Sequence, residues 1–190
     1  MLLVLGDSLS AEYGLARGAG WVALLEKRLA AEKLAWRVVN ASISGETTSG
    51  GRSRLAALLK QHQPRVVVLE LGGNDALRGL PLDMTRNNLA DMARAAKAAG
   101  ARVLIAGMAM PPNYGRAYGE AFTALFATVA QAEKLLFLAE KGFELGVKTR
   151  LEVQDAELNL SSARANLARA QRDYNVARVN LEWVAGTLGQ

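Results

Sequence analysis

The sequence contains no cysteine and only one histidine, His62. The lack of cysteine excludes disulfide bridges and cysteine catalysis, although it does not fix the cellular compartment. No apolar run approaches the roughly 20 residues of a membrane-spanning helix. No signal peptide is visible, because the first apolar run begins at residue 2. A leader that had already been removed would leave the same picture.

Aromatic residues make up only 6% of the 190 residues, and the formal net charge is +5. The basic residues are spread along amphipathic stretches and do not form a block. Nucleic-acid binding typically requires clustered basic residues together with stacking aromatics, so we expect no nucleic-acid partner. Hydrophobic residues reach 51% and charged residues 22%, which is enough for a folded core.

The first two thirds of the chain alternate short apolar runs with amphipathic stretches. The runs cover 2–5, 38–43, 66–71 and 103–108, and the predicted helices between them cover 20–33, 51–62 and 83–99. Continuous apolar runs suit strands that are buried on both faces. The order of elements therefore predicts an α/β fold with a doubly wound parallel sheet of about four strands, in which ligands bind at the carboxyl ends.

After about residue 120 the pattern changes to heptad spacing with no further strand. One apolar series runs from Phe122 to Phe143, and a second, out of phase with the first, runs from Val153 to Val184. Large residues alternate with alanine in the second series, which is typical of a coiled coil. A break near Gly146 and a capping box at Thr149 predict a helical hairpin.

Three predicted strand ends carry groups suited to acyl transfer. Ser8 follows the first strand in LGDSLSAEYG, Gly45 follows the second in SISGETT, and Asn74 follows the third in LGGNDALRG. A hydroxyl could act as a nucleophile, while a glycine N–H and an amide N–H could stabilise the tetrahedral oxygen. Taken alone, the GDSL motif is equally consistent with a tight turn, and Asp7 and Asp75 are expected to have structural roles.

The motifs LGDSLSAEYGL, NASISGETTSGG, LLKQHQPRVVVLELGGNDALRG and MPPNYGRAYGEAF occur in this order. Through these four motifs, residues 1 to about 126 resemble the SGNH (GDSL) hydrolases, in particular the arylesterase/thioesterase I/lysophospholipase group. The resemblance implies a serine esterase of small acyl or aryl esters, without cofactor or metal, in the periplasm or secreted. It implies that Ser8 is the nucleophile and that Ser8, Gly45 and Asn74 form the oxyanion hole. The implied substrate-binding residues are Met108, Pro111, Asn113 and Tyr114.

The fourth block of that family, a DxxH that supplies the catalytic Asp and His, does not occur in this sequence. The family carries a histidine at the position of His62 as well, separate from the catalytic one. His62 ends a predicted helix that runs away from the strand ends, and about 12 residues at 1.5 Å each give roughly 18 Å. We therefore expect His62 to be structural and any general base to be non-standard.

Residues 127–189, including GVKTRLEVQDAELNL, resemble the helical hairpin of TolC-family outer-membrane efflux proteins. The chain is therefore predicted to consist of a truncated SGNH-like domain, 1–126, and a helical hairpin, 127–190. The joint could be a natural fusion, a recombination artefact or an engineered one. We expect the fourth strand to lie at the sheet edge and the chain to form a homo-oligomer, most simply a dimer.

Two functions follow from these features. The first is a serine esterase or thioesterase with an incomplete triad and low or residual activity. The alternative is a catalytically impaired hydrolase domain fused to a coiled-coil association module. The missing DxxH block favours the alternative for turnover, whereas the match to the hydrolases favours the first for substrate binding.

Overall fold

The computed structural model of the chain describes residues 1–144 and residue 154. The chain divides into two compact units, Met1–Gln131 and Ala132–Gln190. The elements, in chain order, are β1 (Leu2–Gly6), α1 (Trp21–Ala31), β2 (Val38–Asn40), α2 (Thr48–His62), β3 (Val66–Glu70), α3 (Gly73–Leu77), α4 (Leu82–Ala98), β4 (Arg102–Ile105), a 3₁₀ helix η1 (Pro112–Tyr114) and α5 (Arg116–Glu144).

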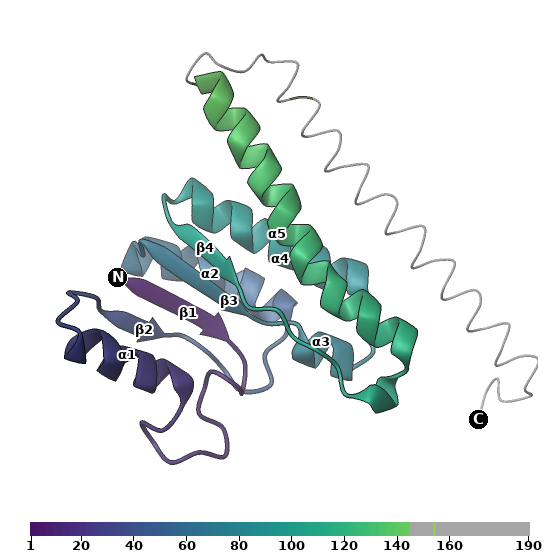
Figure 1. Cartoon of the computed structure of the whole chain (residues 1–190), viewed down its shortest axis with the longest axis horizontal. Helices are drawn as coiled ribbons and strands as arrows, with labels where there is room; N and C mark the ends of the chain where they lie inside the picture. Colours follow the sequence, from purple (N-terminus) through teal and green to yellow (C-terminus); the bar gives the residue numbers. More distant parts are fainter. Residues whose placement is uncertain (145–153, 155–190) are drawn as a thin grey trace, which may run out of the picture. The chain divides into compact units, whose positions relative to one another are not determined.

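The four strands form one sheet in the order β2-β1-β3-β4, and every neighbouring pair is parallel (Figure 1). In the register, Leu2 is opposite Val38 on one side and Val66 on the other, and Val66 in turn is opposite Arg102. Because all four strands run in the same direction, the loops that follow them emerge at one edge of the sheet. The predicted parallel α/β sheet of four strands is confirmed.

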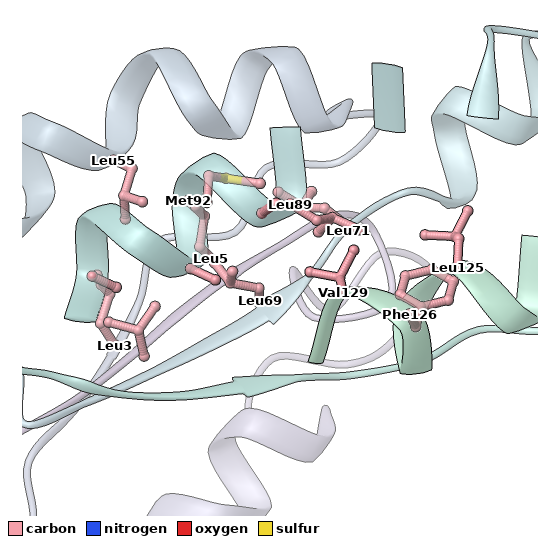
Figure 2. Close-up of a cluster of buried hydrophobic side chains, with 14 of the residues drawn as sticks. Leu3, Leu5, Leu55, Leu69, Leu71, Leu89, Met92, Leu125, Phe126 and Val129 are labelled. Carbon is pink, nitrogen blue, oxygen red and sulfur yellow. The ribbon is translucent and has the colours of Figure 1, made fainter. Parts of the chain in front are cut away.

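Successive residues of β1 and β3 point to opposite faces of the sheet, and the two faces are packed differently. Leu3, Leu5 and Leu69 belong to a large core cluster that includes side chains of α2, α4 and α5 (Figure 2). On the opposite face, Val4 and Val68 pack with Val22 of α1 in a smaller cluster. The alternation of a strand thus supplies both layers of the core.

Local signals account for the helix that follows the second strand. The Thr47 hydroxyl accepts a hydrogen bond from the Gly50 N–H at 3.3 Å, so Thr47 caps α2. Because of this cap, α2 begins at Thr48, three residues before the predicted start at residue 51. At the other end, Gln63 adopts a left-handed conformation and its N–H bonds to Leu59 O.

The structure corrects several predicted bounds. The runs predicted as strands at 38–43 and 103–108 contain only three strand residues each, and β4 also includes Arg102. The prediction that the strands are buried on both faces is wrong for the outer two, because no residue of β2 or β4 is fully buried. The short helix α3 was not predicted. The expected position of the fourth strand at the sheet edge agrees with the order of the strands.

The first heptad series begins within α5, where Phe122, Leu125 and Val129 are buried in the large core cluster. The second series, the predicted break at Gly146 and the capping box at Thr149 fall outside the described residues. The coiled-coil hairpin and the predicted boundary at residue 126 therefore remain predictions. In the described part of the chain, no helix combines the length and the apolar character that crossing a membrane requires.

Candidate active site

The loops after β1, β2 and β3 carry the three residues predicted to act on an acyl group. Ser8 lies in the turn just after β1, Gly45 lies in the loop between β2 and α2, and Asn74 lies in α3, just after β3. Ser8 is half-buried, and within residues 1–144 its hydroxyl makes no hydrogen bond. The carboxyl ends of parallel strands are the usual ligand-binding edge of such a sheet.

The Asn74 side chain connects the other two positions. Its Nδ2 donates to Asp7 Oδ2 at 3.0 Å and to the Glu46 carbonyl at 3.1 Å. Asp7 immediately precedes Ser8, and Glu46 immediately follows Gly45. The structure therefore brings all three predicted site positions together around one amide group.

Gly45 adopts a φ of +78°, a conformation that a residue with a Cβ rarely adopts. Its carbonyl accepts a hydrogen bond of 2.8 Å from Arg78 Nη2, and Arg78 directly follows α3. The loop after β2 is thus attached at two points to the segment that carries Asn74. This attachment limits how far the Gly45 N–H can move relative to Asn74.

An ion pair stabilises the same loop from its other side. Arg54 of α2 bonds to both carboxylate oxygens of Glu46, and its Nη2 also donates to the Ala41 carbonyl at 2.8 Å. The Glu46 side chain is only 7% exposed in this pair. Arginine suits this role because its planar guanidinium can satisfy several acceptors at once.

Beneath the loops, Asp75 is fully buried and acts as an acceptor. Its Oδ2 accepts the Thr48 N–H at 2.8 Å, and its Oδ1 accepts the Thr48 hydroxyl at 2.5 Å. Asn88 of α4 donates in turn to the Thr48 hydroxyl at 3.0 Å. Asp75 therefore joins α3 to the first residue of α2, which agrees with the structural role expected from the sequence.

Two buried carboxyl groups lie close to the turn that carries Ser8. Asp7 is 3% exposed and Glu70 is 6% exposed. Burial raises the pKa of Asp7, although hydrogen bonds from the Leu9 N–H and Asn74 counteract the rise. Burial also raises the pKa of Glu70, against the bond from Ser10, and the neighbouring Asp7 charge raises it further.

Sequence analysis did not identify Glu70 as part of the site. A signal was available, because Glu70 is the one charged residue within the apolar run 66–71, which was predicted to be buried on both faces. A buried carboxyl group needs hydrogen-bond partners, so its position in a central strand indicates a polar contact across the strand end.

The predicted substrate-binding residues lie on the segment after β4. The half-buried Met108 side chain comes close to Gly73, since a Cβ added to Gly73 would lie 3.3 Å from the Met108 sulfur. Pro111 and Asn113 are exposed, and Tyr114 is 38% exposed. Among the described residues, hydrogen bonds connect the loops of Ser8, Gly45 and Asn74. None of these four side chains takes part in them.

A cavity of about 650 Å³ lies beside this segment. It is lined by Met110, Pro111, Gly115, Arg116, Gly119, Glu120, Thr123 and Ala124. Ser8, Gly45 and Asn74 are not among its lining residues. Of the four predicted substrate-binding residues, Pro111 alone lines it.

His62 is the last residue of α2, which begins next to the site at Thr48. A helix of 15 residues extends about 22 Å. His62 thus precedes the amino end of β3, whereas Ser8 follows the carboxyl end of the parallel strand β1. Within the described residues, no group of three or more His, Asp or Glu side chains is arranged to hold a metal ion.

Comparison with known proteins adds to this geometry. Residues 4–156 match the model of the GDSL-like Lipase/Acylhydrolase family. The chain is 56% identical to Esterase TesA of Pseudomonas aeruginosa over 133 residues, which cover 70% of this chain and 66% of the relative. It is 49% identical to Thioesterase 1/protease 1/lysophospholipase L1 of Escherichia coli K12 over 130 residues, which cover 68% and 61%. The matches thus span less than two thirds of either relative.

Among solved structures, the chain is similar to the psychrotrophic esterase EstA from a Pseudoalteromonas species, in a form inhibited by monoethylphosphonate. The TM-score is 0.67 at 33% identity, and the match covers 87% of this chain and 98% of EstA. The family model covers more than half of the chain, including all three loops that meet at Asn74. This chain therefore belongs to the GDSL-like lipase/acylhydrolase family, the SGNH hydrolases.

Proposed function

We propose that the chain is a serine-dependent carboxylic-ester hydrolase that acts on small acyl or aryl esters and thioesters. The observation that carries the proposal is the position of Asn74, whose amide bonds to the neighbours of both Ser8 and Gly45. The names of the relatives, an esterase and a thioesterase/lysophospholipase, support the same substrate class.

In the proposed reaction, Ser8 Oγ attacks the carbonyl carbon of the ester. A new bond forms between Oγ and carbon, and the π electrons of the carbonyl group move onto its oxygen. The N–H groups of Ser8 and Gly45 and the Asn74 amide donate to this oxyanion. Asn74 uses its Nδ2 for Asp7 and Glu46 in the free chain, so we expect it to exchange one of these acceptors for the oxyanion.

Collapse of the intermediate restores the carbonyl group and breaks the bond to the leaving oxygen or sulfur. The proton lost by Ser8 ends on this leaving group, and water then hydrolyses the acyl-serine in the same way. These 190 residues contain no DxxH block, so we propose that no histidine of the chain assists the proton transfer. Hydrolases without a complete triad keep an advantage of about 10³–10⁴ over water, which sets the expected activity.

We further propose that the acyl group extends toward the segment after β4. The cavity beside Pro111 measures about 650 Å³, within the range of about 300–1,000 Å³ that is typical of ligand pockets. Its lining consists largely of apolar and glycine residues. The Met108 side chain lies close to Gly73, the residue before Asn74, and Met108 is two residues before Met110, which lines the cavity.

The test uses hydrolysis of p-nitrophenyl butyrate by the pure protein. We expect slow release of p-nitrophenol that is abolished in Ser8→Ala. Ser53→Ala, an exposed serine of α2, is the matched control and is expected to retain the activity. Equal rates in Ser8→Ala and the unchanged chain would contradict the proposal. A turnover of about ten per second or more would show that another base exists.

The predicted dimer remains a proposal, and the position of β4 supports it. Within the described residues β4 pairs only with β3, and its Leu104 is 58% exposed. An unprotected strand edge beside an exposed apolar side chain favours pairing with a second copy. Light scattering should give the mass of a dimer, and Leu104→Glu should lower it. A monomer mass for the unchanged chain would contradict the proposal.

A further inference from the structure

Glu70 is the last residue of β3 and lies in the middle of the sheet, between β1 and β4. Only 6% of it is exposed, and it is preceded in the same strand by the buried residues Val67, Val68 and Leu69. Burying a carboxyl group costs free energy unless its oxygens find hydrogen-bond donors. The contacts of Glu70 therefore indicate what the residue is for.

One carboxylate oxygen of Glu70 accepts both of the hydrogen bonds found. The Ser10 hydroxyl donates to Oε2 at 2.7 Å, and the Asp7 N–H donates to the same oxygen at 3.4 Å. Ser10 Oγ also accepts a hydrogen bond from Trp21 Nε1–H at 3.1 Å. Indole can only donate, so the Ser10 oxygen is the acceptor in that bond, while the Ser10 hydroxyl donates to Glu70.

These contacts hold the turn of the nucleophile at two points. Asp7 and Ser10 are the residues on either side of the Ser8–Leu9 pair, and both bond to Glu70 Oε2. The backbone of the same turn is attached on its other side, where Asn40 of β2 donates to the Ser10 carbonyl at 2.7 Å. Ser8 thus lies between two anchored residues.

The end of β1 leaves room for this contact. Gly6 is opposite Glu70 in the register of the two strands. A Cβ on Gly6 would lie 2.7 Å from both Glu70 Oε2 and Ser10 Oγ, which is closer than real Cβ contacts. Only glycine at this position allows the carboxyl group to reach Ser10.

The second oxygen of Glu70, Oε1, is buried and has no hydrogen-bond partner within the described residues. The nearby charge is that of Asp7, which raises the pKa of Glu70 in addition to the effect of burial. Asp7 itself faces Asn74, Asp75 and Glu46. Glutamine has nearly the same shape as the Glu70 side chain, carries no charge, and keeps an acceptor oxygen for both donors.

We propose that Glu70 is a positioning residue for Ser8, which acts by anchoring Ser10 and the Asp7 N–H on either side of the nucleophile. The inference rests on the proposed role of Ser8 as nucleophile. Glu70 does not touch the substrate in this account. It determines where the Ser8 hydroxyl and its own N–H point relative to Gly45 and Asn74.

The experiment compares Glu70→Gln, which keeps an acceptor for both donors, with Glu70→Leu, which has a similar volume and no acceptor. Two quantities are measured: kcat and KM for p-nitrophenyl butyrate, and the rate at which a fluorophosphonate modifies Ser8. We expect Glu70→Leu to lower kcat and the modification rate by about tenfold, with KM nearly unchanged. Glu70→Gln should restore both rates to within about threefold of the unchanged chain.

Leu59→Ala is the control for a loss of stability alone, because Leu59 is buried near the far end of α2. It should lower the melting temperature without slowing the modification of Ser8. Glu70→Leu rates equal to those of Leu59→Ala would overturn the proposal. If Glu70→Leu does not fold, Ser10→Ala breaks the same anchor without a change in β3 and should slow both rates in the same way.

Hydrogen exchange separates this inference from the proposed function. The N–H groups of Leu9, Ser10 and Ala11 bond to Asp7 within the turn, and we expect them to exchange faster in Glu70→Leu but not in Glu70→Gln. A chain that shows this difference but no reaction at Ser8 would refute the proposed function and keep the anchoring. Equal exchange in the two variants would overturn the anchoring, whatever the activity.

Discussion

The ends of the first three strands differ sharply from the end of the fourth. After β1, β2 and β3, hydrogen bonds connect one loop to the next, through Asn74 and through the contact of Asp75 with Thr48. After β4, the Ala106 N–H bonds to the Leu69 carbonyl of β3 at 2.9 Å, and the bond at η1 is local, from the Tyr114 N–H to the Pro111 carbonyl at 3.2 Å. Position in the sheet alone does not explain the difference, because β2 is also an outer strand. The loop after β2 is joined to α3 and Arg78 through the Glu46 and Gly45 carbonyls, and buried polar groups of this kind must satisfy one another.

The largest expected effect comes from deleting a side chain in a central and in an outer strand. Leu69 of β3 is fully buried, whereas Leu104 of β4 is 58% exposed. We expect Leu69→Ala to lower the free energy of unfolding of the monomer by about 2–5 kcal/mol, and Leu104→Ala by less than about 0.5 kcal/mol. Urea denaturation at a protein concentration below that at which the proposed dimer forms measures both values. Similar losses in the two variants at that concentration would show that Leu104 is covered within the chain itself.

A matched pair of asparagines tests the same contrast at the level of catalysis. Asn74 bonds to both neighbouring loops, whereas Asn87 is exposed on α4 and has no part in the site. We expect Asn74→Ala to lower kcat for p-nitrophenyl butyrate by about 10²–10³, the loss typical of an oxyanion donor. Asn87→Ala should stay within about threefold. An Asn74→Ala variant that keeps full activity would remove Asn74 from the oxyanion hole.

Two threonines test the buried connection between α2 and α3. Thr48 is fully buried and its hydroxyl bonds to Asp75 and Asn88, whereas exposed Thr123 bonds only to the Gly119 carbonyl of its own helix. We expect Thr48→Val to destabilise the fold by about 1–3 kcal/mol, because it leaves the Asn88 amide with one buried partner fewer. Thr123→Val should change stability by less than about 0.5 kcal/mol. Thermal unfolding of the two variants gives the comparison.

The pH dependence of stability should have opposite signs at two glutamates. The raised pKa of Glu70 means that its contribution is full below the ordinary value of 4.5 and is lost as the pH rises through the folded value. The N–H groups of Gly18 and Gly20 lower the pKa of Glu12, so its contribution is present above 4.5 and is lost as the pH falls.

Urea denaturation across a range of pH tests both signs. Relative to Glu70→Gln, the unchanged chain should lose stability with increasing pH, by about 1.4 kcal/mol for each unit by which the pKa is raised. Relative to Glu12→Gln, it should gain stability as the pH rises toward 4.5 and change little above that value. If the two differences change in the same direction, the description of one of the two carboxyl groups is wrong.

The smallest effect is expected at His62, which lies near the amino ends of the strands, whereas Ser8 follows the carboxyl end of β1. We expect His62→Ala to leave the esterase rate within about threefold and to act, if at all, on the end of α2. A loss as complete as that in Ser8→Ala, with the far-UV spectrum unchanged, would show that His62 reaches the nucleophile and that the arrangement of α2 is different.

The sequence was sufficient to predict the features that depend on local pattern. The apolar runs predicted four parallel strands, and their order placed Ser8, Gly45 and Asn74 at one edge of the sheet. The extents of β2 and β4 were predicted too long, because the apolar runs continue into the loops that follow these strands. Glu70 was missed for a related reason, since its partners Ser10 and Asp7 are about 60 residues away in the chain.

The most direct test of the central claim is to identify the residue that reacts with a fluorophosphonate probe. Mass spectrometry of the intact protein counts the adducts, and peptide mapping locates them. We expect one adduct per chain on Ser8, absent in Ser8→Ala and unaffected in Ser53→Ala. An adduct on another residue, or equal modification of Ser8→Ala, would contradict the assignment of Ser8 as the nucleophile.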